Sequence, residues 1–159
     1  MQTKKRTYQP VDIRWMIRRD LDAIVEIESQ SFPSPWTEEK FIEQLRVRNN
    51  IGMVFTYQDV VAGYVVYALH KTSIEILNLA VHPEYRRCSA ATLLIEKLQY
   101  KVNGHHRRNH ITALVRESNL PAQLLFAKNH FYCDGIVKGA YNDSDEDAYS
   151  FFYGGLLLS

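Results

Sequence analysis

One stretch of the sequence has the layout of a phosphate-binding loop. In VHPEYRRCSAATLL, residues 81–94, an apolar run ends, a proline-containing turn brings in two arginines, and an Ala- and Leu-rich helical segment follows. Backbone N–H groups at a helix N-terminus can hold an anion such as a pyrophosphate. Loops of this kind normally use glycine, because a Cβ obstructs the tight turn and the approach of the phosphates. Here Ser89, Ala90 and Ala91 stand where glycines are expected, so the sequence predicts an anion site with an unusual loop.

Two polar clusters have the residue types of metal ligands without the spacing. His105, His106 and His110 lie in GHHRRNH, and a zinc site there would need a fourth ligand and better-ordered spacing. The acidic run DSDED, residues 143–147, is followed by Ala148 where a calcium loop needs glycine. We therefore expect two solvated turns and no metal site.

The N-terminal segment has the pattern of a strand followed by a helix. DIRWMIRR alternates, with Ile13, Trp15 and Ile17 on one side of the expected strand. Asp20 is a suitable N-cap for a helix over residues 21–27, whose apolar residues form one stripe.

A proline-rich break and a hairpin follow. SFPSPW ends the first helix, because two prolines in three residues forbid its continuation, and Phe32 and Trp36 could frame a substrate. Thr37 is an expected N-cap for a second helix with apolar residues at helical spacing. Two strand-like runs then meet at Gln58 and Asp59, which predicts a hairpin turn.

The rest of the chain alternates strands and helices. This order predicts an α/β fold, a mixed sheet with helices on both faces. The expected elements are a buried central strand over 74–81, a helix over 92–103, a strand over 110–115, a helix over 121–130 opening on Pro121, a strand around Ile136 and a strand over 148–158.

Length and composition bound the class of protein. With 159 residues, 46% hydrophobic and 23% charged, the chain is expected to form one globular domain over residues 12–159 after a flexible tail at 1–11. A net charge of +1 gives no case for nucleic acid or an anionic membrane as the main partner. No signal peptide or bilayer-spanning run is visible, and two cysteines make no disulfide framework. We expect a cytoplasmic enzyme or binding domain.

Four stretches link the chain to a known family. They are EIESQSFPSPWTEEKF, EILNLAVHPEYRR, VRESNLPAQLLFAKNHF and EDAY, in that order. Together they resemble the GNAT N-acetyltransferases and, within them, the RimI-like group that acetylates protein N-termini. The resemblance covers residues 13–158. It implies a GNAT fold whose mixed sheet splays at its fourth and fifth strands, acetyl-CoA as donor, an amine as acceptor and no metal.

The resemblance also implies a set of cofactor contacts. The family loop pattern Q/R-x-x-G-x-G/A falls on residues 86–91, and Ser89 replaces its first glycine. If this position needs positive φ, serine costs about 1 kcal/mol or more; if it is a helix N-cap, serine is favourable and its hydroxyl could contact phosphate. Splayed strand backbone would meet the pantetheine arm, and Asn119 matches a residue that hydrogen-bonds the CoA. The full expected set is Leu79, Ala80, Val81, Arg86, Arg87, Cys88, Ser89, Ala90, Ala91, Thr92, Asn119 and Phe126.

The proton-transfer residues of the RimI-like group are absent. The resemblance places the usual base at Leu114 and the usual acid at Phe126, and neither side chain can transfer a proton. Glu75 lies where another GNAT branch places its base, and burial beside the splay would raise its pKa. For the acid we favour Tyr141, which precedes the acidic run. Two other tyrosines, Tyr132 and Tyr149, are candidates by chemistry alone.

We expect an acetyl-CoA-dependent N-acetyltransferase acting on an α-amino group of a protein or peptide. It is expected to be slow, because the usual base and acid are both replaced. A positioned acid or base raises the rate of such a reaction by about 10²–10⁴-fold. An α-amine, with a pKa near 7.7–8.0, is already partly neutral at neutral pH, so the reaction stays feasible. Two alternatives remain: an impaired GNAT domain that binds CoA or a protein partner, and an acyltransferase with another acyl or acceptor specificity.

Overall fold

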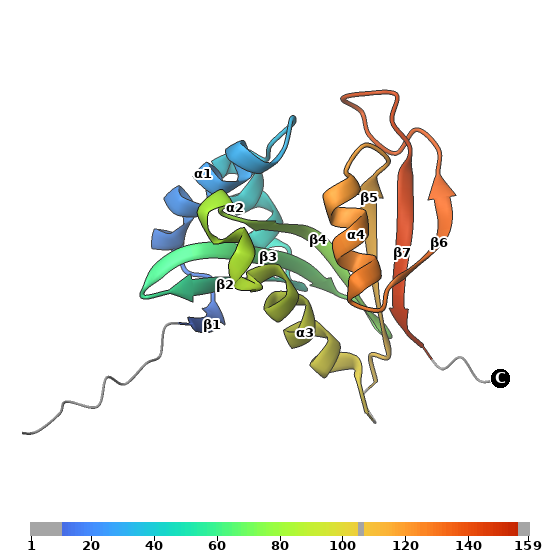
Figure 1. Cartoon of the computed structure of the whole chain (residues 1–159), viewed down its shortest axis with the longest axis horizontal. Coiled ribbons are helices and arrows are strands. Elements are labelled where there is room, and N and C mark those ends of the chain that lie inside the picture. Colours follow the sequence, from blue (N-terminus) through green and yellow to red (C-terminus); the bar gives the residue numbers. More distant parts are fainter. Residues whose placement is uncertain (1–10, 105–106, 156–159) are drawn as a thin grey trace, which may run out of the picture.

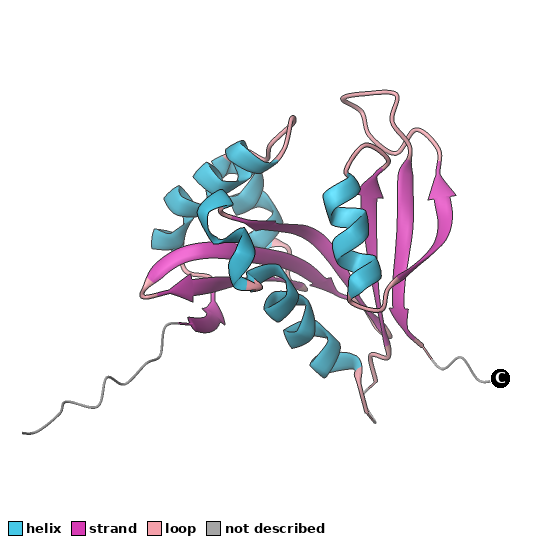
Figure 2. Cartoon of the chain, in the orientation of Figure 1, coloured by secondary structure: helices cyan, strands magenta, loops and turns pink. Residues whose placement is uncertain are grey.

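The computed structural model describes residues 11–104 and 107–155, and of Arg87 and Cys88 it describes only the backbone. Figures 1 and 2 show strands that form one sheet with helices packed on it. The elements are β1 (Val11–Trp15), η1 (Arg18–Asp20), α1 (Leu21–Ser31), α2 (Glu38–Arg46), β2 (Asn50–Tyr57), β3 (Val60–Leu69), β4 (Ser73–Val81), η2 (Pro83–Cys88), α3 (Ala90–Val102), β5 (His110–Arg116), α4 (Leu120–Lys128), β6 (Tyr132–Val137) and β7 (Ala148–Gly154).

The seven strands are arranged in the order β1-β2-β3-β4-β5-β7-β6. The β4–β5 pair is parallel, and the other neighbouring pairs are antiparallel. Helices α1 and α2 cover one face of the sheet, and α3 and α4 cover the other. The predicted α/β class, a mixed sheet with helices on both faces, is therefore confirmed.

Local sequence signals set several of these boundaries. The Thr37 hydroxyl accepts a hydrogen bond from the Lys40 amide at 3.2 Å and so caps α2, as predicted. Gln58 and Asp59 both have positive φ, 49° and 65°, which is the geometry of a tight two-residue hairpin turn. Pro121 lies in the first turn of α4, where its missing N–H costs nothing.

The N-terminal segment departs from the prediction. β1 already includes Val11, and it ends at Trp15, so Trp15 and Ile17 are 58% and 45% exposed instead of sharing a buried strand face. Asp20 precedes α1 but makes no side-chain cap. Its carboxylate instead accepts hydrogen bonds from the Arg14 guanidinium at 2.8 and 2.9 Å, because this pairing offsets the cost of its burial.

Two hydrophobic cores lie on opposite faces of the sheet. The one under α3 and α4 includes Phe55, Leu94, Ile111 and Phe126, and the one under α1 and α2 includes Ile24, Phe41 and Tyr64. These cores hold both helical layers against a sheet whose centre is β4.

The sheet opens at its centre. β4 and β5 pair only from Ser73 opposite His110 to Ile76 opposite Ala113, although both strands continue. Figure 1 shows them diverging beyond this point. In the same place β4 contains a bulge, since Val66 of β3 lies opposite Asn78 and Tyr67 opposite Ile76, which leaves Leu77 as the extra residue.

Within the described ranges, no helix is both long enough and apolar enough to cross a membrane. The last predicted strand ends at Gly154, and the residues from 156 onward lie outside the described part of the chain.

Candidate active site

A cleft of about 250 Å³ occupies the opening between β4 and β5. Side chains from both faces of the sheet line it. One side consists of Glu28 of α1, the loop after α1 and Tyr141; the other consists of α4 and Asn119. The strand edges between them are Ile76–Leu79 of β4 and Ala113–Arg116 of β5.

The predicted anion loop leads into α3. Ser89 has φ 57° and ψ 22°, in the left-handed region, and its side chain makes no capping hydrogen bond. Ser89 therefore stands at the N-cap position and also has positive φ. Its side chain is strained in this conformation and makes no compensating cap. Ala90 is 1% exposed, and Ala91 and Thr92 follow in the first helical turn, whose N–H groups have no partner within the helix. Nothing is described of the Arg87 and Cys88 side chains.

The expected contacts on β4 continue from this loop into the opening. Leu79 lines the cleft, whereas the Ala80 and Val81 side chains are buried in the two cores. Their backbone lies beyond the last β4–β5 pair. Arg86 donates through Nε to the Val81 carbonyl at 3.4 Å, so one predicted cofactor residue already engages another.

Asn119 and Phe126 belong to the α4 side of the cleft. The Asn119 side-chain oxygen accepts from the Ala122 amide at 3.2 Å, so Asn119 caps α4 as well as lining the cleft. Phe126 is 4% exposed and packs its ring edge-on against Phe131 at 5.0 Å between centroids. Leu114, where the resemblance places the usual base, lines the cleft and is 49% exposed.

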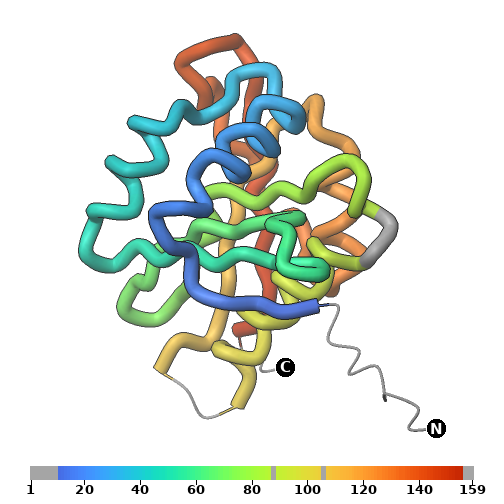
Figure 3. The backbone as a smooth tube through the Cα atoms, turned by 90° about the vertical axis from the view of Figure 1, so that its left-hand side faces the viewer, coloured from blue at the N-terminus to red at the C-terminus, as the bar shows by residue number. Residues whose placement is uncertain are grey.

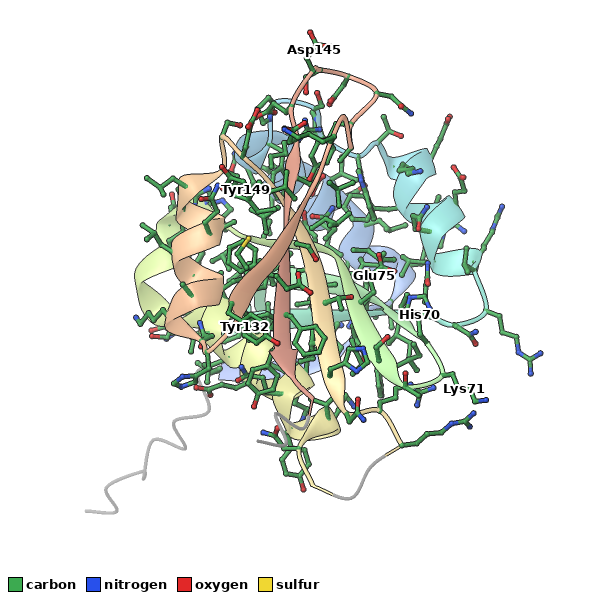
Figure 4. All side chains as sticks on the ribbon, turned by 90° about the vertical axis from the view of Figure 1, so that its right-hand side faces the viewer. His70, Lys71, Glu75, Tyr132, Asp145 and Tyr149 are labelled. Atoms are coloured by element: carbon green, nitrogen blue, oxygen red, sulfur yellow. The ribbon has the colours of Figure 1, made fainter. Side chains whose placement is uncertain are left out.

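The structure does not bring Glu75 to the cleft. Its carboxylate lies 2.8 Å from His70 Nε2, in the part of β4 that still pairs with β5. Figure 4 shows the two side chains beside each other near Lys71 at the end of the strand. The sequence placed Glu75 next to the splay, but the splay begins only after Ile76, so its environment is the solvated strand end.

Of the three tyrosines considered as acids, Tyr141 lines the cleft. Tyr132 and Tyr149 lie on β6 and β7, where Tyr132 packs against Phe152 and Tyr149 against the α3–α4 core (Figure 4). Burial raises the pKa of Tyr141, and Arg116 opposes this shift. The Tyr141 hydroxyl therefore stays protonated at neutral pH.

Arg116 organises the loop between β6 and β7. Its guanidinium donates to both carboxylate oxygens of Asp143 at 3.0 and 2.7 Å, and to Glu146 at 3.2 Å. The Arg116 hydrogen bonds hold the pKa of Asp143 at about 2. Glu146 also accepts from the Ser118 amide at 3.2 Å, which ties the loop to the start of α4.

The loop after α1 and the loop between β6 and β7 lie side by side over the cleft (Figure 3). The Ser34 side chain also lowers the pKa of Asp143, so the loop after α1 lies close to the β6–β7 loop. Trp36 and Phe32 line the cleft from the first of these loops, beside Tyr141 from the second. An aromatic mouth therefore leads to the opening in the sheet.

Glu28 is a site residue that sequence reasoning missed. It lines the cleft from α1 and is 2% exposed. It accepts hydrogen bonds from the Trp36 amide at 2.9 Å, from Asn78 Nδ2 at 2.8 Å and from the Tyr64 hydroxyl. A signal was present: Glu28 lies seven residues after Leu21 and four after Ile24, on the apolar stripe of α1, where a carboxylate must be paired.

Burial dominates the electrostatics of Glu28. Desolvation raises its pKa, and hydrogen bonds from the Trp36 amide, Tyr64 and Asn78 reduce the shift. Burial and the neighbouring Glu28 charge raise the pKa of Tyr64 in turn, so Tyr64 is a donor and not a phenolate. The site thus contains a carboxyl group whose protonated form is favoured more than it would be in water.

The acidic run and the histidines do not assemble a metal centre in the described ranges, where no group of three or more His, Cys, Asp or Glu has that arrangement. Asp143 and Glu146 pair with Arg116, and Asp147 accepts from the Gly139 amide at 2.9 Å. His105 and His106 lie outside the described residues.

Comparison with known proteins identifies the class. The model of the Acetyltransferase (GNAT) family matches residues 21–131, from the start of α1 past the end of α4. The chain belongs to this family and is an N-acetyltransferase. It is 34% identical, over 86% of its own length and 90% of the relative's, to a Bacillus subtilis (strain 168) protein that carries the provisional name ribosomal protein bS18-alanine N-acetyltransferase.

Solved structures share the fold. The structure of Ard1 from Thermoplasma volcanium matches with a TM-score of 0.82 at 22% identity, over 92% of this chain and 99% of that one. Arabidopsis thaliana NAA60 in complex with acetyl-CoA matches with a TM-score of 0.78 at 19% identity, over 91% and 99% of the two chains. The predicted GNAT fold is therefore confirmed.

Proposed function

We propose that this N-acetyltransferase transfers the acetyl group of acetyl-CoA to the α-amino group of a protein or peptide. The observation that supports this most directly is the cleft, which is lined from both faces of the sheet. A donor on the α3–α4 side and an acceptor under the aromatic mouth would meet where β4 and β5 part. Positioning alone can supply a large share of the rate.

The proposed donor site fits the residues present. The N–H groups of the first turn of α3 would hold the pyrophosphate, with Arg86 and Arg87 beside it. The β4 backbone at Leu79–Val81, past the last β4–β5 pair, would receive the pantetheine arm, and Asn119 and Phe126 would flank it. Acetyl-CoA supplies a thioester, whose carbonyl carbon accepts the amine.

The proposed acceptor site is the aromatic mouth. Trp36 and Phe32 would lie along the peptide backbone, and Tyr141 would donate its proton to the leaving sulfur. An α-amine suits this site better than a lysine side chain, because its pKa near 7.7–8.0 leaves a larger neutral fraction than the lysine value near 10.4.

A second candidate is a GNAT domain that binds CoA or a protein partner without efficient turnover. Ser89 in the left-handed region and the apolar residues Leu114 and Phe126 favour it. Its cleft would be occupied in the same way, so ligand binding alone does not separate the two candidates.

The test has two stages. Calorimetric titration with acetyl-CoA comes first, and saturable micromolar binding is expected. Peptides with free N-termini are then incubated with the protein and acetyl-CoA and examined by mass spectrometry. Acetylation of α-amines supports the proposal, and binding without acetylation supports the second candidate. No binding of acetyl-CoA contradicts the proposal and leaves only the protein-binding form of the second candidate.

A further inference from the structure

Glu28 lies where a proton acceptor for the acceptor amine is needed. It belongs to α1, yet its side chain reaches the cleft next to Leu77 and Asn78, the residues at the bulge of β4. This is the point at which β4 leaves β5 and the opening through the sheet begins. On the other side it contacts Trp36 of the mouth.

The hydrogen bonds of Glu28 leave one oxygen with spare capacity. Oε2 accepts from both Asn78 Nδ2 and the Tyr64 hydroxyl, which uses its two lone pairs. Oε1 accepts only the Trp36 amide among the described residues, so a second lone pair remains for an N–H from a ligand in the cleft. Three donors, from the loop after α1, from β3 and from β4, fix the carboxylate in this orientation.

The other cleft-lining residues offer no competing base. Of the described side chains that line the cleft, Glu28 is the one carboxylate. Leu114 and Phe126 cannot accept a proton, Arg116 remains cationic, and Tyr141 is protonated. The titratable groups that face Glu28 are Tyr64 of β3 and, along the lining of the cleft, Arg116 of β5 and Tyr141.

We propose that Glu28 is the catalytic base of the reaction, and that its Oε1 takes the proton of the attacking α-amine. This proposal rests on the proposed function. As the amine nitrogen forms a bond to the acetyl carbon, the carbon–sulfur bond breaks and its electron pair leaves with the sulfur. Glu28 receives the proton that nitrogen loses and later returns it to solvent; the thiolate takes its proton from Tyr141 or from water.

The environment of Glu28 suits a proton that is taken up and released. Burial raises its pKa, so protonation in mid-reaction costs less than it would for an exposed glutamate. The hydrogen bonds from Tyr64, Asn78 and Trp36 still support the ionised form before reaction. A purely structural glutamate would satisfy the same donors, so the test has to distinguish the two roles.

The decisive variant is Glu28→Gln, with Glu26→Gln as the matched control. Glu26 is an exposed residue of the same helix, two positions away. The substrates are acetyl-CoA and the peptide most strongly acetylated by the wild type. We expect Glu28→Gln to lower kcat by about 10²-fold or more at neutral pH, with partial recovery at higher pH where the amine is already neutral. Acetyl-CoA affinity should match that of Glu26→Gln, which would show that the fold and the donor site are retained.

A second variant keeps the test decisive if Glu28→Gln fails to fold. Tyr64→Phe retains the carboxylate but removes a donor that favours its ionised form, so the acidic limb of the kcat/KM–pH profile should move to higher pH. An unmoved limb, or a Glu28→Gln enzyme with wild-type kcat, overturns Glu28 as the base and leaves the proposed function standing. A wild type that acetylates no N-terminal peptide overturns the proposed function itself.

Discussion

The guanidinium carbon of Arg116 lies 3.8 Å from the centroid of the Tyr141 ring, a cation–π contact between two residues that line the cleft. The same guanidinium forms the two-oxygen pair with Asp143, two residues further along the loop. A single β5 side chain thus holds the tyrosine, and the loop that bears it, over the opening in the sheet. Arg116 is a positioning residue for the acceptor mouth.

Removing this side chain should affect acceptor binding more than donor binding. For Arg116→Ala we expect the peptide KM to rise about tenfold, the equivalent of one charge-assisted hydrogen bond, while acetyl-CoA affinity changes little. Lys138→Ala is the control, because Lys138 pairs with Asp147 in the same loop but is 83% exposed. Steady-state kinetics with both variants check this, and equal effects would contradict the role of Arg116.

Ser89→Gly should relieve backbone strain at the start of α3. A non-glycine residue in the left-handed region costs about 1–2 kcal/mol, and glycine loses about 0.5–1 kcal/mol through its more flexible unfolded chain. We therefore expect a net stabilisation of about 0.5 kcal/mol and tighter acetyl-CoA binding. Urea unfolding and calorimetry measure the two. Ser89→Ala keeps the strain and removes the hydroxyl, so a gain of equal size in that variant would rule out strain as the cause.

Leu114→Glu should restore a base at the position that the family resemblance indicates. Leu114 is 49% exposed on the cleft wall, so a carboxylate there keeps its hydration. If Glu28 is the base, the substitution should raise kcat about tenfold or more in the Glu28→Gln background and far less in the wild type. Leu114→Gln in both backgrounds is the control, and a large gain confined to the wild type would argue against Glu28.

The stability of the protein should carry a pH signature of Glu28. Its native pKa is raised, so the folded state binds this proton more tightly than the unfolded state does. The contribution is complete below the ordinary glutamate pKa of about 4.3 and is lost as pH rises through the native value. Asp143, with a pKa lowered to about 2, acts in the opposite sense: its contribution is present above the ordinary aspartate pKa and lost as pH falls.

The measurement is the difference in unfolding free energy between the wild type and Glu28→Gln, from urea unfolding between about pH 4 and pH 8. Subtraction cancels Asp143 and the other carboxylates shared by both proteins. We expect the wild type to lose stability relative to the variant as pH rises, by about 1.4 kcal/mol for each pH unit by which the native pKa exceeds the ordinary one. Parallel curves would show that the buried carboxylate is not titrating abnormally.

Local signals predicted most of the fold. The Thr37 cap, the Gln58-Asp59 turn and the proline at the start of α4 depend on chemistry within a few residues, so they could be identified from the sequence. The exposure of Trp15 could not, because alternation predicts a strand without saying which of its side chains other elements cover. β2 pairs with β1 as far as Trp15, and the chain then turns away.

The candidate site was predictable where it depends on family motifs and not where it depends on the packing of distant segments. Asn119 and Phe126 line the cleft, and their role as cofactor contacts, which the resemblance implies, stays a prediction. Glu75 does not, because the point at which β4 and β5 separate is set by the bulge and by the twist of the sheet, which no short pattern records. Glu28 depends on three donors 8, 36 and 50 residues away in sequence, so its role emerged only from the folded chain.

The bulge at Leu77 limits how the length of this chain can vary. Ile76 and Leu79 pack toward the α3–α4 core with two residues between them, where plain alternation would allow one. Deleting a single residue here would restore strict alternation and turn every later β4 side chain to the opposite core, with Val81 and the turn into α3 displaced as well. Single-residue insertions and deletions cannot be absorbed at this point of the strand, and length variation among functional relatives should fall in the hairpin turns instead.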